Sequence, residues 1–161
     1  MTRSLAKTAA DVMATDVFTA SPRWTLEELE RMLCKKRVSG FPVVEGQNLV
    51  GVVSRSDVIR TLCVERSRAG EMGAYFRAYD ADEEANALSL LAEEQTVSAR
   101  MSHEHVSDVM SPPTFVVAPT APIREVASLL WTNRIHRLPV TEGTRLVGII
   151  SSLDLVRLLA E

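Results

Sequence analysis

Apolar residues in the first half of the chain form a helical spacing followed by two dense runs. Leu26, Leu29 and Leu33 lie three to four residues apart, which predicts one buried face of a helix. The runs at 41–44 and 49–53 flank a polar turn that contains a glycine, which predicts a β-hairpin. This half of the chain is therefore predicted to contain a helix followed by two paired strands.

A short element is predicted on each side of this helix and hairpin. Val17, Phe18 and Thr19 form a brief apolar run that stops at Pro22, which favours a short strand leading into a turn. After the hairpin, Ser54 begins a second helical segment with its own apolar spacing. The predicted order of elements is strand, helix, strand, strand, helix.

The second half of the chain repeats this order. Ile123, Val126 and Leu130 have the helical spacing, and the apolar runs at 138–141 and 146–150 flank a turn at Gly143. Phe115, Val116 and Val117 form the preceding short run, and a final helix begins at Ser151.

The two halves match residue by residue when the chain is shifted by 97 positions. The stretch 11–60 aligns with 108–157 without a gap, and 18 of its 50 positions are identical. Many of the other pairs exchange one apolar residue for another, such as Val38 for Ile135. The repeat is therefore a folding unit, and because units of about 50 residues bury little apolar surface alone, the two copies are expected to share a core.

These patterns predict an α/β protein made of two tandem βαββα repeats, packed about a pseudo-twofold axis. The repeats span 10–62 and 107–161. A connector over 63–106 is expected to be partly helical, because 83–100 has amphipathic spacing behind an acidic start. Aromatic residues lie before that helix, at Tyr75, Phe76 and Tyr79.

Composition narrows the classes of function. The 161 residues are 46% hydrophobic and 24% charged, and the formal net charge is only −3, so no bulk attraction to a nucleic acid polymer is expected. The longest uncharged stretch, 109–123, has 15 residues and four prolines, so no membrane span is expected. Cys34 and Cys63 have no cysteine counterpart in the other copy, and we expect buried or half-buried free thiols in a cytoplasmic protein.

Each second helix begins with a serine followed three residues later by an aspartate, and two readings of this spacing stay open. Ser54 with Asp57, and Ser151 with Asp154, have the spacing of a capping box, so helix capping alone explains them. Alternatively, backbone N–H groups at a helix start favour a polar or anionic ligand, and an aspartate there can accept hydrogen bonds from the vicinal hydroxyls of a ribose.

Taken together, the motifs resemble the cystathionine β-synthase (CBS) domain. They are an Asp-Val-Met before the first strand, a Pro-Val hairpin that ends in Leu-Val-Gly and a serine, and an aspartate three residues after that serine. Both copies carry the full set, so the chain resembles a stand-alone tandem CBS pair, also called a Bateman module. Such pairs are regulatory sensors that bind adenosine-containing ligands in clefts between the repeats.

The resemblance implies a set of ligand-binding residues in each copy. Aspartates would hold ribose hydroxyls, serines would lie by the sugar or phosphate, the first strands would edge the adenine, and apolar hairpin residues would sandwich it. In copy one these are Val17, Phe18, Thr19, Gly40, Phe41, Pro42, Ser54, Arg55 and Asp57. In copy two they are Phe115, Val116, His136, Arg137, Leu138, Pro139, Ser151 and Asp154.

The copies differ just before the first hairpin strand. Copy two has His136 and Arg137, donors suited to phosphate, where copy one has Ser39 and Gly40. Gly40 leaves room for a ligand whose phosphate is met by Arg55 or Arg137. We therefore expect two unequal sites, with at least one occupied.

The sequence predicts a binding protein rather than an enzyme. No nucleophile, base and orienting group occur at a recognisable spacing, and His103-Glu104-His105 is too weak a pattern for a metal site. The expected ligand is AMP, ADP, ATP or S-adenosylmethionine, and the regulated target is a separate chain. The alternative is a ligand-free dimerisation or assembly module.

A homodimer is expected in either case, because several apolar residues lie off the predicted core faces. They are Met32, Trp131, Leu158 and Leu159. The resemblance implies a flat disc of four repeats. Trp131 is either the anchor of the interface or buried within its own repeat.

Overall fold

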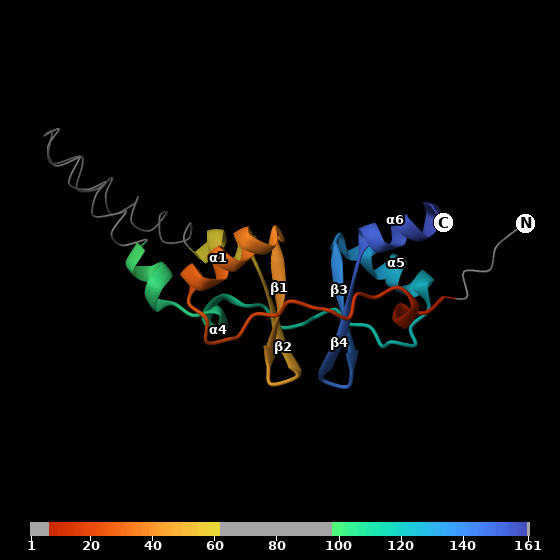
Figure 1. Ribbon diagram of the computed structural model, residues 1–161, viewed down its shortest axis with the longest axis horizontal. Coiled ribbons are helices and arrows are strands. Elements are labelled where there is room, and N and C mark those ends of the chain that lie inside the picture. Colours follow the sequence, from red (N-terminus) through yellow and green to blue (C-terminus); the bar gives the residue numbers. More distant parts are fainter. Residues whose placement is uncertain (1–6, 62–97, 161) are drawn as a thin grey trace, which may run out of the picture. The chain divides into compact units, whose positions relative to one another are not determined.

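The computed structural model describes residues 7–61 and 98–160 and shows the repeated order of helices and strands (Figure 1). Residues 55–61 and 98–103 are also helical. The named elements are η1 (Ala9–Asp11), α1 (Leu26–Lys36), β1 (Gly40–Glu45), β2 (Asn48–Ser54), α4 (Val106–Val109), α5 (Ile123–Asn133), β3 (Arg137–Glu142), β4 (Arg145–Ser151) and α6 (Ser152–Ala160).

Both predicted hairpins are present and join in one sheet with the strand order β1-β2-β4-β3. Gly46 and Gly143 occupy the hairpin turns with φ of 65° and 61°, where a side chain would be strained. β2 pairs antiparallel with β4 through Asn48 and Arg145. The α/β fold class is confirmed.

The short first strand of each repeat is less regular than predicted. Residues 17–19 form no regular strand, and in the second copy only Val117 pairs, through a single parallel bridge to Val140. The amide of Val117 donates to the Pro139 carbonyl at 3.1 Å, and its carbonyl accepts from Thr141 at 2.9 Å. A proline follows each run, Pro22 in the first copy and Pro119 in the second, and limits its length because proline has no amide hydrogen to donate to a ladder.

The first helix of each repeat buries the face that its spacing predicts. Leu26, Leu29 and Leu33 of α1 are fully buried, as Ile123, Val126 and Leu130 of α5 are buried. Both helices end at an arginine in the left-handed region, Arg37 and Arg134, each with φ of 53°. The two copies therefore share the position and the backbone conformation of this helix end. Both place an arginine in a conformation that usually favours glycine.

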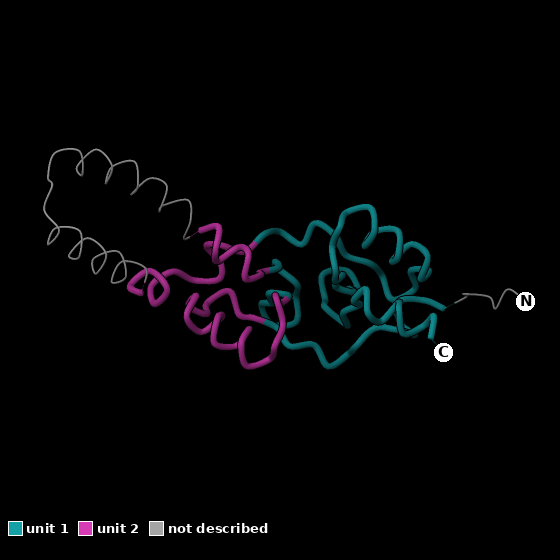
Figure 2. The backbone as a smooth tube through the Cα atoms, turned by 90° about the horizontal axis from the view of Figure 1, so that it is seen from above, with its two compact units in different colours: residues 1–19, 42–52, 111–161 teal, residues 20–41, 53–110 magenta. Residues whose placement is uncertain are grey.

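The described chain divides into two compact units that cut across the two repeats (Figure 2). One unit holds residues 1–19, 42–52 and 111–161, and the other holds 20–41 and 53–110. The segment that leads into each repeat therefore belongs to the unit that contains the helices of the other repeat.

In the first unit, residues 8–14 complete the core of the second repeat. Ala9 and Val12 are buried in one cluster with Ile123 and Leu138. The Ala9 amide donates to the Ala121 carbonyl at 2.8 Å, and Ala14 exchanges hydrogen bonds of 2.9 and 3.0 Å with Ile149. The leading segment thus joins the second repeat through both its backbone and its apolar side chains.

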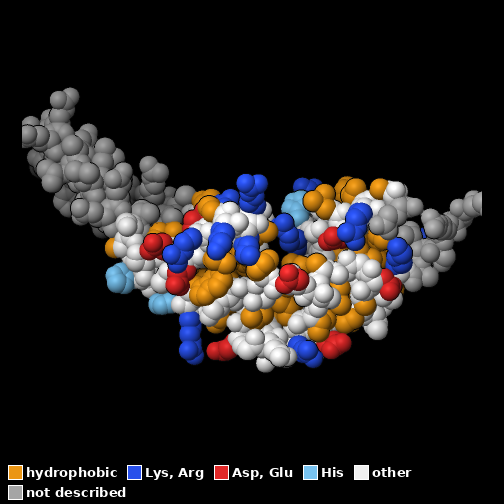
Figure 3. Space-filling view, viewed as in Figure 1, with side chains coloured by type: hydrophobic (Ala, Val, Ile, Leu, Met, Phe, Trp, Pro, Cys, Tyr) orange, Lys and Arg blue, Asp and Glu red, His pale blue; other side chains and the backbone are white. Residues whose placement is uncertain are grey.

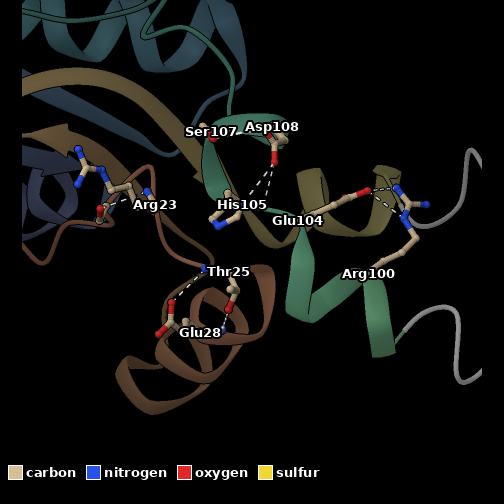
Figure 4. A network of polar contacts seen from close by, with 9 residues as sticks. Arg23, Thr25, Glu28, Arg100, Glu104, His105, Ser107 and Asp108 are labelled. Carbon is tan, nitrogen blue, oxygen red and sulfur yellow. Dashed lines mark hydrogen bonds and ion pairs between the residues drawn. The ribbon is translucent and has the colours of Figure 1, made fainter.

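In the second unit, residues 104–108 pack in the equivalent way on the first repeat (Figure 4). The Leu26 amide donates to the Glu104 carbonyl at 3.0 Å, and the Val106 amide donates to the Trp24 carbonyl at 2.8 Å. Val106, which is fully buried, is the counterpart of Ala9 at the 97-residue shift. The exchange of leading segments is therefore reciprocal.

The aspartate of each Asp-Val-Met motif closes the turn of its leading segment. Asp11 accepts a hydrogen bond from the Thr8 amide at 2.7 Å, and Asp108 accepts one from the His105 amide at 2.9 Å. The hydrogen bond from the Thr8 backbone, followed by that from the Thr8 hydroxyl, lowers the pKa of Asp11 below its usual value.

Several sequence predictions concern residues at the edges of the described part. The predicted helix over 83–100 lies outside the described residues except for 98–100, and Cys63 and the connector tyrosines lie outside them entirely. Cys34 is a free thiol, but it is exposed rather than buried, because Leu33 takes the core-facing position beside it. No described helix is long and apolar enough to cross a membrane.

We predict that Asp11→Asn destabilises the protein at neutral pH and that this difference disappears in acid. Because the pKa of Asp11 is lowered by folding, its carboxylate stabilises the native state above the unfolded pKa, and this contribution is lost as pH falls through the folded pKa. Urea unfolding at pH 7 and pH 3 measures the difference between the two proteins. Asp16→Asn, at an exposed position, controls for the lost charge. A difference that is the same at both pH values would contradict the prediction.

Candidate functional site

The junction between the second hairpin and α6 brings together four of the predicted site residues. Arg137 and Ser151 are directly paired in the β3–β4 ladder. The Ser152 amide at the start of α6 donates to the His136 carbonyl at 3.0 Å. His136 and Arg137 are exposed there, beside the half-buried Ser151 and Asp154.

The serine and aspartate at this junction form the predicted capping box. The Ser151 amide and hydroxyl donate to Oδ2 of Asp154 at 2.7 and 2.6 Å, and the Asp154 amide donates to the Ser151 hydroxyl at 3.3 Å. Among the described residues, the two bonds from Ser151 to the Asp154 carboxylate both end at Oδ2. Capping therefore occupies one side of the carboxylate and leaves Oδ1 to meet another group.

The equivalent junction in the first copy is more closed. The Arg55 amide donates to the Ser39 carbonyl at 2.9 Å, and the Ser54 amide and hydroxyl donate to Oδ2 of Asp57 at 2.7 and 2.6 Å. Asp57 is only 8% exposed, and its Oδ1 accepts a 2.8 Å hydrogen bond from Arg60. Both carboxylate oxygens of Asp57 thus have partners within its own helix start.

Sequence reasoning did not find the Asp57–Arg60 ion pair, although its signal was present. The two residues are three positions apart on one helix, a spacing that places opposite charges side by side. The pairing is peripheral, because the Arg60 side chain is 66% exposed, and an exposed ion pair of this kind contributes about 0–1 kcal/mol.

Arg55, predicted to meet a ligand phosphate, lies against α1. Its Nε is 3.5 Å from Oε1 of Glu30, and its Nη2 is 3.7 Å from Sγ of Cys34. The Cys34 thiol in turn donates to Glu30 at 3.4 Å. A phosphate at the first junction would have to compete with Glu30 for this guanidinium.

A glycine at position 40 is required by the packing of the hairpin. A Cβ added there would lie 2.7 Å from the Val53 carbonyl oxygen and 3.2 Å from the Cα of Ser54. The space that a side chain would need is therefore taken by the neighbouring strand, so the hairpin itself requires a glycine at this position.

The apolar residues predicted to sandwich an adenine are buried in this structure. Leu138 is fully buried in the core of its unit, and Phe41 is 4% exposed, with its ring edge-on to Trp24 at a centroid distance of 6.5 Å. Pro42 and Pro139 are buried as well. These four side chains contribute to the core, so direct contact with a base would require the core to open.

The residues predicted to edge the adenine present more surface. Phe18 is 49% exposed, Phe115 37% and Val116 40%, while Val17 and Thr19 are half-buried. Large apolar side chains exposed in an irregular segment are suited to a ligand or another surface.

The His103-Glu104-His105 sequence serves a structural purpose. Arg100 Nε donates to Oε1 of Glu104 at 2.9 Å, and His105 precedes α4 as its N-cap (Figure 4). Among residues 7–61 and 98–160, no group of three potential ligands is placed to hold a metal ion.

The chain belongs to the CBS-domain family. The model of that family, described as the CBS domain, matches residues 9–63 and 106–161. The matched segments are the two duplicated halves, each with its leading turn.

Individual relatives agree with this membership. The chain is 28% identical over 144 residues to the chloroplastic CBS domain-containing protein CBSX1 of Arabidopsis thaliana, and the match covers 88% of this chain. It is also 28% identical over 149 residues to an inosine-5'-monophosphate dehydrogenase of Korarchaeum cryptofilum, covering 92% of this chain. The chain spans 58% of the length of CBSX1 and 23% of that of the dehydrogenase.

Among solved structures, the chain is similar to that of CBSX2 in complex with AMP. The TM-score is 0.67 and the identity 25%, and the match covers 96% of each chain. The arrangement of elements in a CBS pair is therefore shared.

We predict that Gly40→Ala destabilises the protein by about 1–3 kcal/mol, because the new methyl group would press on backbone that cannot yield like a flexible side chain. Urea unfolding monitored by circular dichroism measures the loss. Ser56→Ala, at an exposed position on the following helix, is the control and should change little. If Gly40→Ala is as stable as Ser56→Ala, the hairpin can accommodate a Cβ at position 40 and the predicted steric clash is wrong.

Proposed function

We propose that this protein is an adenine-nucleotide sensor, with AMP its first candidate ligand, and that the junction of β3 with α6 is its principal binding site. The observation that carries the proposal is that the capping bonds among the described residues use only Oδ2 of Asp154, whose carboxylate lies at a helix start near two exposed basic residues. The AMP complex of CBSX2, which has the same arrangement of elements, supports an adenosine ligand.

The chemistry of this junction fits a nucleotide. Oδ1 of Asp154 is an acceptor for the hydroxyls of a ribose, and such charge-assisted bonds contribute about 1.5–3 kcal/mol each. The exposed His136 and Arg137 supply donors for a phosphate, and the start of α6 adds the positive end of a nine-residue helix. Sugar and phosphate thus have separate partners within a few residues.

The two copies are not equivalent in this proposal. Asp57 is buried and engaged by Arg60, Arg55 is held by Glu30, and the position of Arg137 is taken by Gly40. The first copy therefore binds the same ligand more weakly than the second.

The proposed output is regulation of a separate target protein by a homodimer, without catalysis. A ligand shifts a conformational equilibrium only by its difference in affinity between two states, so the sensor needs a binding site next to an element that moves. The Ser151 hydroxyl, a conceivable nucleophile, donates its hydrogen to Asp154, and none of the three histidines is hydrogen-bonded to it. Such a serine is a helix cap rather than an activated nucleophile.

An assembly module without a ligand is the second candidate, and one observation favours it. Large apolar side chains are exposed together on α5 and α6, with Trp131 at 85% and Leu159 at 79%. Such a surface indicates association with a protein. Assembly and ligand binding are compatible in one molecule, so nucleotide titration tests only whether the module works without a ligand.

We predict that AMP binds with micromolar to millimolar affinity and that Asp154→Asn weakens this binding by at least about 10-fold, the equivalent of one lost charge-assisted bond. Asparagine keeps an oxygen that accepts from Ser151, so the helix cap is retained. Isothermal titration calorimetry with AMP, ADP, ATP and S-adenosylmethionine into protein freed of co-purified nucleotide measures the affinities.

Asp57→Asn is the matched control, since it makes the same change at the same place in the first copy and should leave the tighter binding unchanged. Equal losses in both variants would contradict the inequality of the sites. If none of the four compounds binds even at millimolar concentration, the sensor function is wrong and the assembly module is left.

A further inference from the structure

The exposed surface of α1 has an excess of positive charge towards the end of the helix. Arg31, Lys35 and Arg37 are exposed there, and none of their side chains pairs with a carboxylate among residues 7–61 and 98–160. Figure 3 shows basic side chains gathered over this helix. Positive charge that the chain does not neutralise attracts a partner of opposite charge.

The helix over residues 55–61 extends this surface. Arg55 reaches α1, with its Nε 3.5 Å from Oε1 of Glu30 and its Nη2 3.7 Å from Sγ of Cys34, so the two helices lie side by side. Ile59 follows Arg55 by one helical turn and is 54% exposed. We call the surface formed by Arg31, Cys34, Lys35, Arg55 and Ile59 the α1 face.

The charges of the α1 face are not needed to form the helix. Arg31 and Lys35 are four residues apart, a spacing that places like charges side by side and destabilises a helix. Lys35 interacts favourably with the negative end of the helix dipole, but α5 has no basic residue in its last turn. Because α5 has the same length and the same left-handed end, the helix forms equally without these charges.

The second repeat has an apolar surface in the equivalent place. The 97-residue shift replaces the charged residues of the α1 face with uncharged ones, Ser128 for Arg31, Thr132 for Lys35 and Ser152 for Arg55. Trp131 replaces Cys34 and is 85% exposed, which contradicts burial within its own repeat. Leu158 packs half-buried against the core, which corrects its assignment to an exposed surface. The duplicated helices therefore offer different chemistry to a partner.

The α1 face is bounded by acidic residues at the start of the helix. Glu27 and Glu28 lie in the first turn of α1, and the Leu26 amide donates to the Glu104 carbonyl at 3.0 Å, which brings a third glutamate to this end. A long polyanion or an anionic membrane would meet repulsion there. A short acidic segment of a protein can lie against the basic end alone.

We propose that the α1 face binds an acidic, amphipathic segment of the separate protein that this sensor regulates. Carboxylates of that segment pair with Arg31 and Lys35, and its apolar side chains pack on Ile59. Arg55 keeps its ion pair with Glu30 and adds the donors that this pair does not use. The inference rests on the proposed function, because it assigns the surface that recognises the regulated target.

Fluorescence anisotropy with a labelled peptide and the full chain tests this surface. The probe is an amphipathic helical peptide of about 20 residues with glutamate on its polar face, and the same peptide with glutamine is its control. The variant Arg31→Ser with Lys35→Thr introduces the residues of the second repeat, in which the equivalent helix forms. Arg124→Ser with Arg145→Asn removes two exposed positive charges from the second repeat and is the matched control.

We expect the glutamate peptide to bind the unaltered chain at low ionic strength and to bind more weakly at about 150 mM salt, because salt screens exposed charges. Arg31→Ser with Lys35→Thr should raise the dissociation constant at least about fivefold through the loss of two exposed ion pairs. The matched control should leave the constant unchanged, and the glutamine peptide should not bind. Circular dichroism checks that both variants fold.

The inference is wrong if the glutamate peptide does not bind, if Arg31→Ser with Lys35→Thr leaves its affinity unchanged, or if both variants lose affinity equally. Tighter binding to phosphatidylserine vesicles or to duplex DNA, lost in the same variant, would assign the α1 face to a polyanion instead. AMP titration of the unaltered chain separates this inference from the proposed function. AMP binding without peptide binding rejects the α1 face and keeps the sensor, whereas peptide binding without AMP binding keeps the α1 face and rejects the sensor.

Discussion

The exchange of leading segments is the constraint on which the rest of the structure depends. Neither repeat completes its core from its own consecutive residues, because Ala9 and Val12 are buried against the second repeat and Val106 is buried with the first. The backbone bonds of Ala9 to Ala121 and of Leu26 to Glu104 fix the two segments in place. Each repeat is small, so the added apolar burial matters for its stability. The duplicated halves are consequently inseparable as folding units.

The helices and hairpins were predictable from the sequence because their signals are local. Apolar spacing located the buried faces of α1 and α5, and glycine in each polar turn located the hairpins. The exchange of segments was not predictable in this way, since Ala9 and Ile123 are distant in sequence and no local pattern indicates that they pack together. The short strands at 17–19 and 115–117 were overestimated for a related reason: without a partner strand of sufficient length, a β-rich run forms no ladder, and only Val117 makes a single bridge.

The candidate site shows a similar division. The serine and aspartate spacing correctly predicted the capping box at Ser151 and the bonds from Ser54 to Asp57, and the hairpin register brought Arg137 next to Ser151. The ion pairs around the site could not be predicted from the motifs. Whether Asp57 pairs with Arg60, or Arg55 with Glu30, depends on which charged groups the folded chain brings close together. The identical aspartates of the two copies thus differ in their surroundings, and the burial of Phe41 and Leu138 reflects core packing that alternation in a strand does not distinguish from a ligand surface.

The position of α6 links nucleotide binding to self-association in the proposed function. The helix begins at the Ser151–Asp154 box and carries Leu153, Val156 and Leu159 along its exposed side. On the proposed assignments, nucleotide and partner chain act on one rigid element of nine residues. Thermodynamic reciprocity then requires that any effect of the nucleotide on self-association be returned as an equal effect of self-association on nucleotide affinity. The response threshold of such a sensor would therefore depend on the abundance of the protein as well as on that of its ligand.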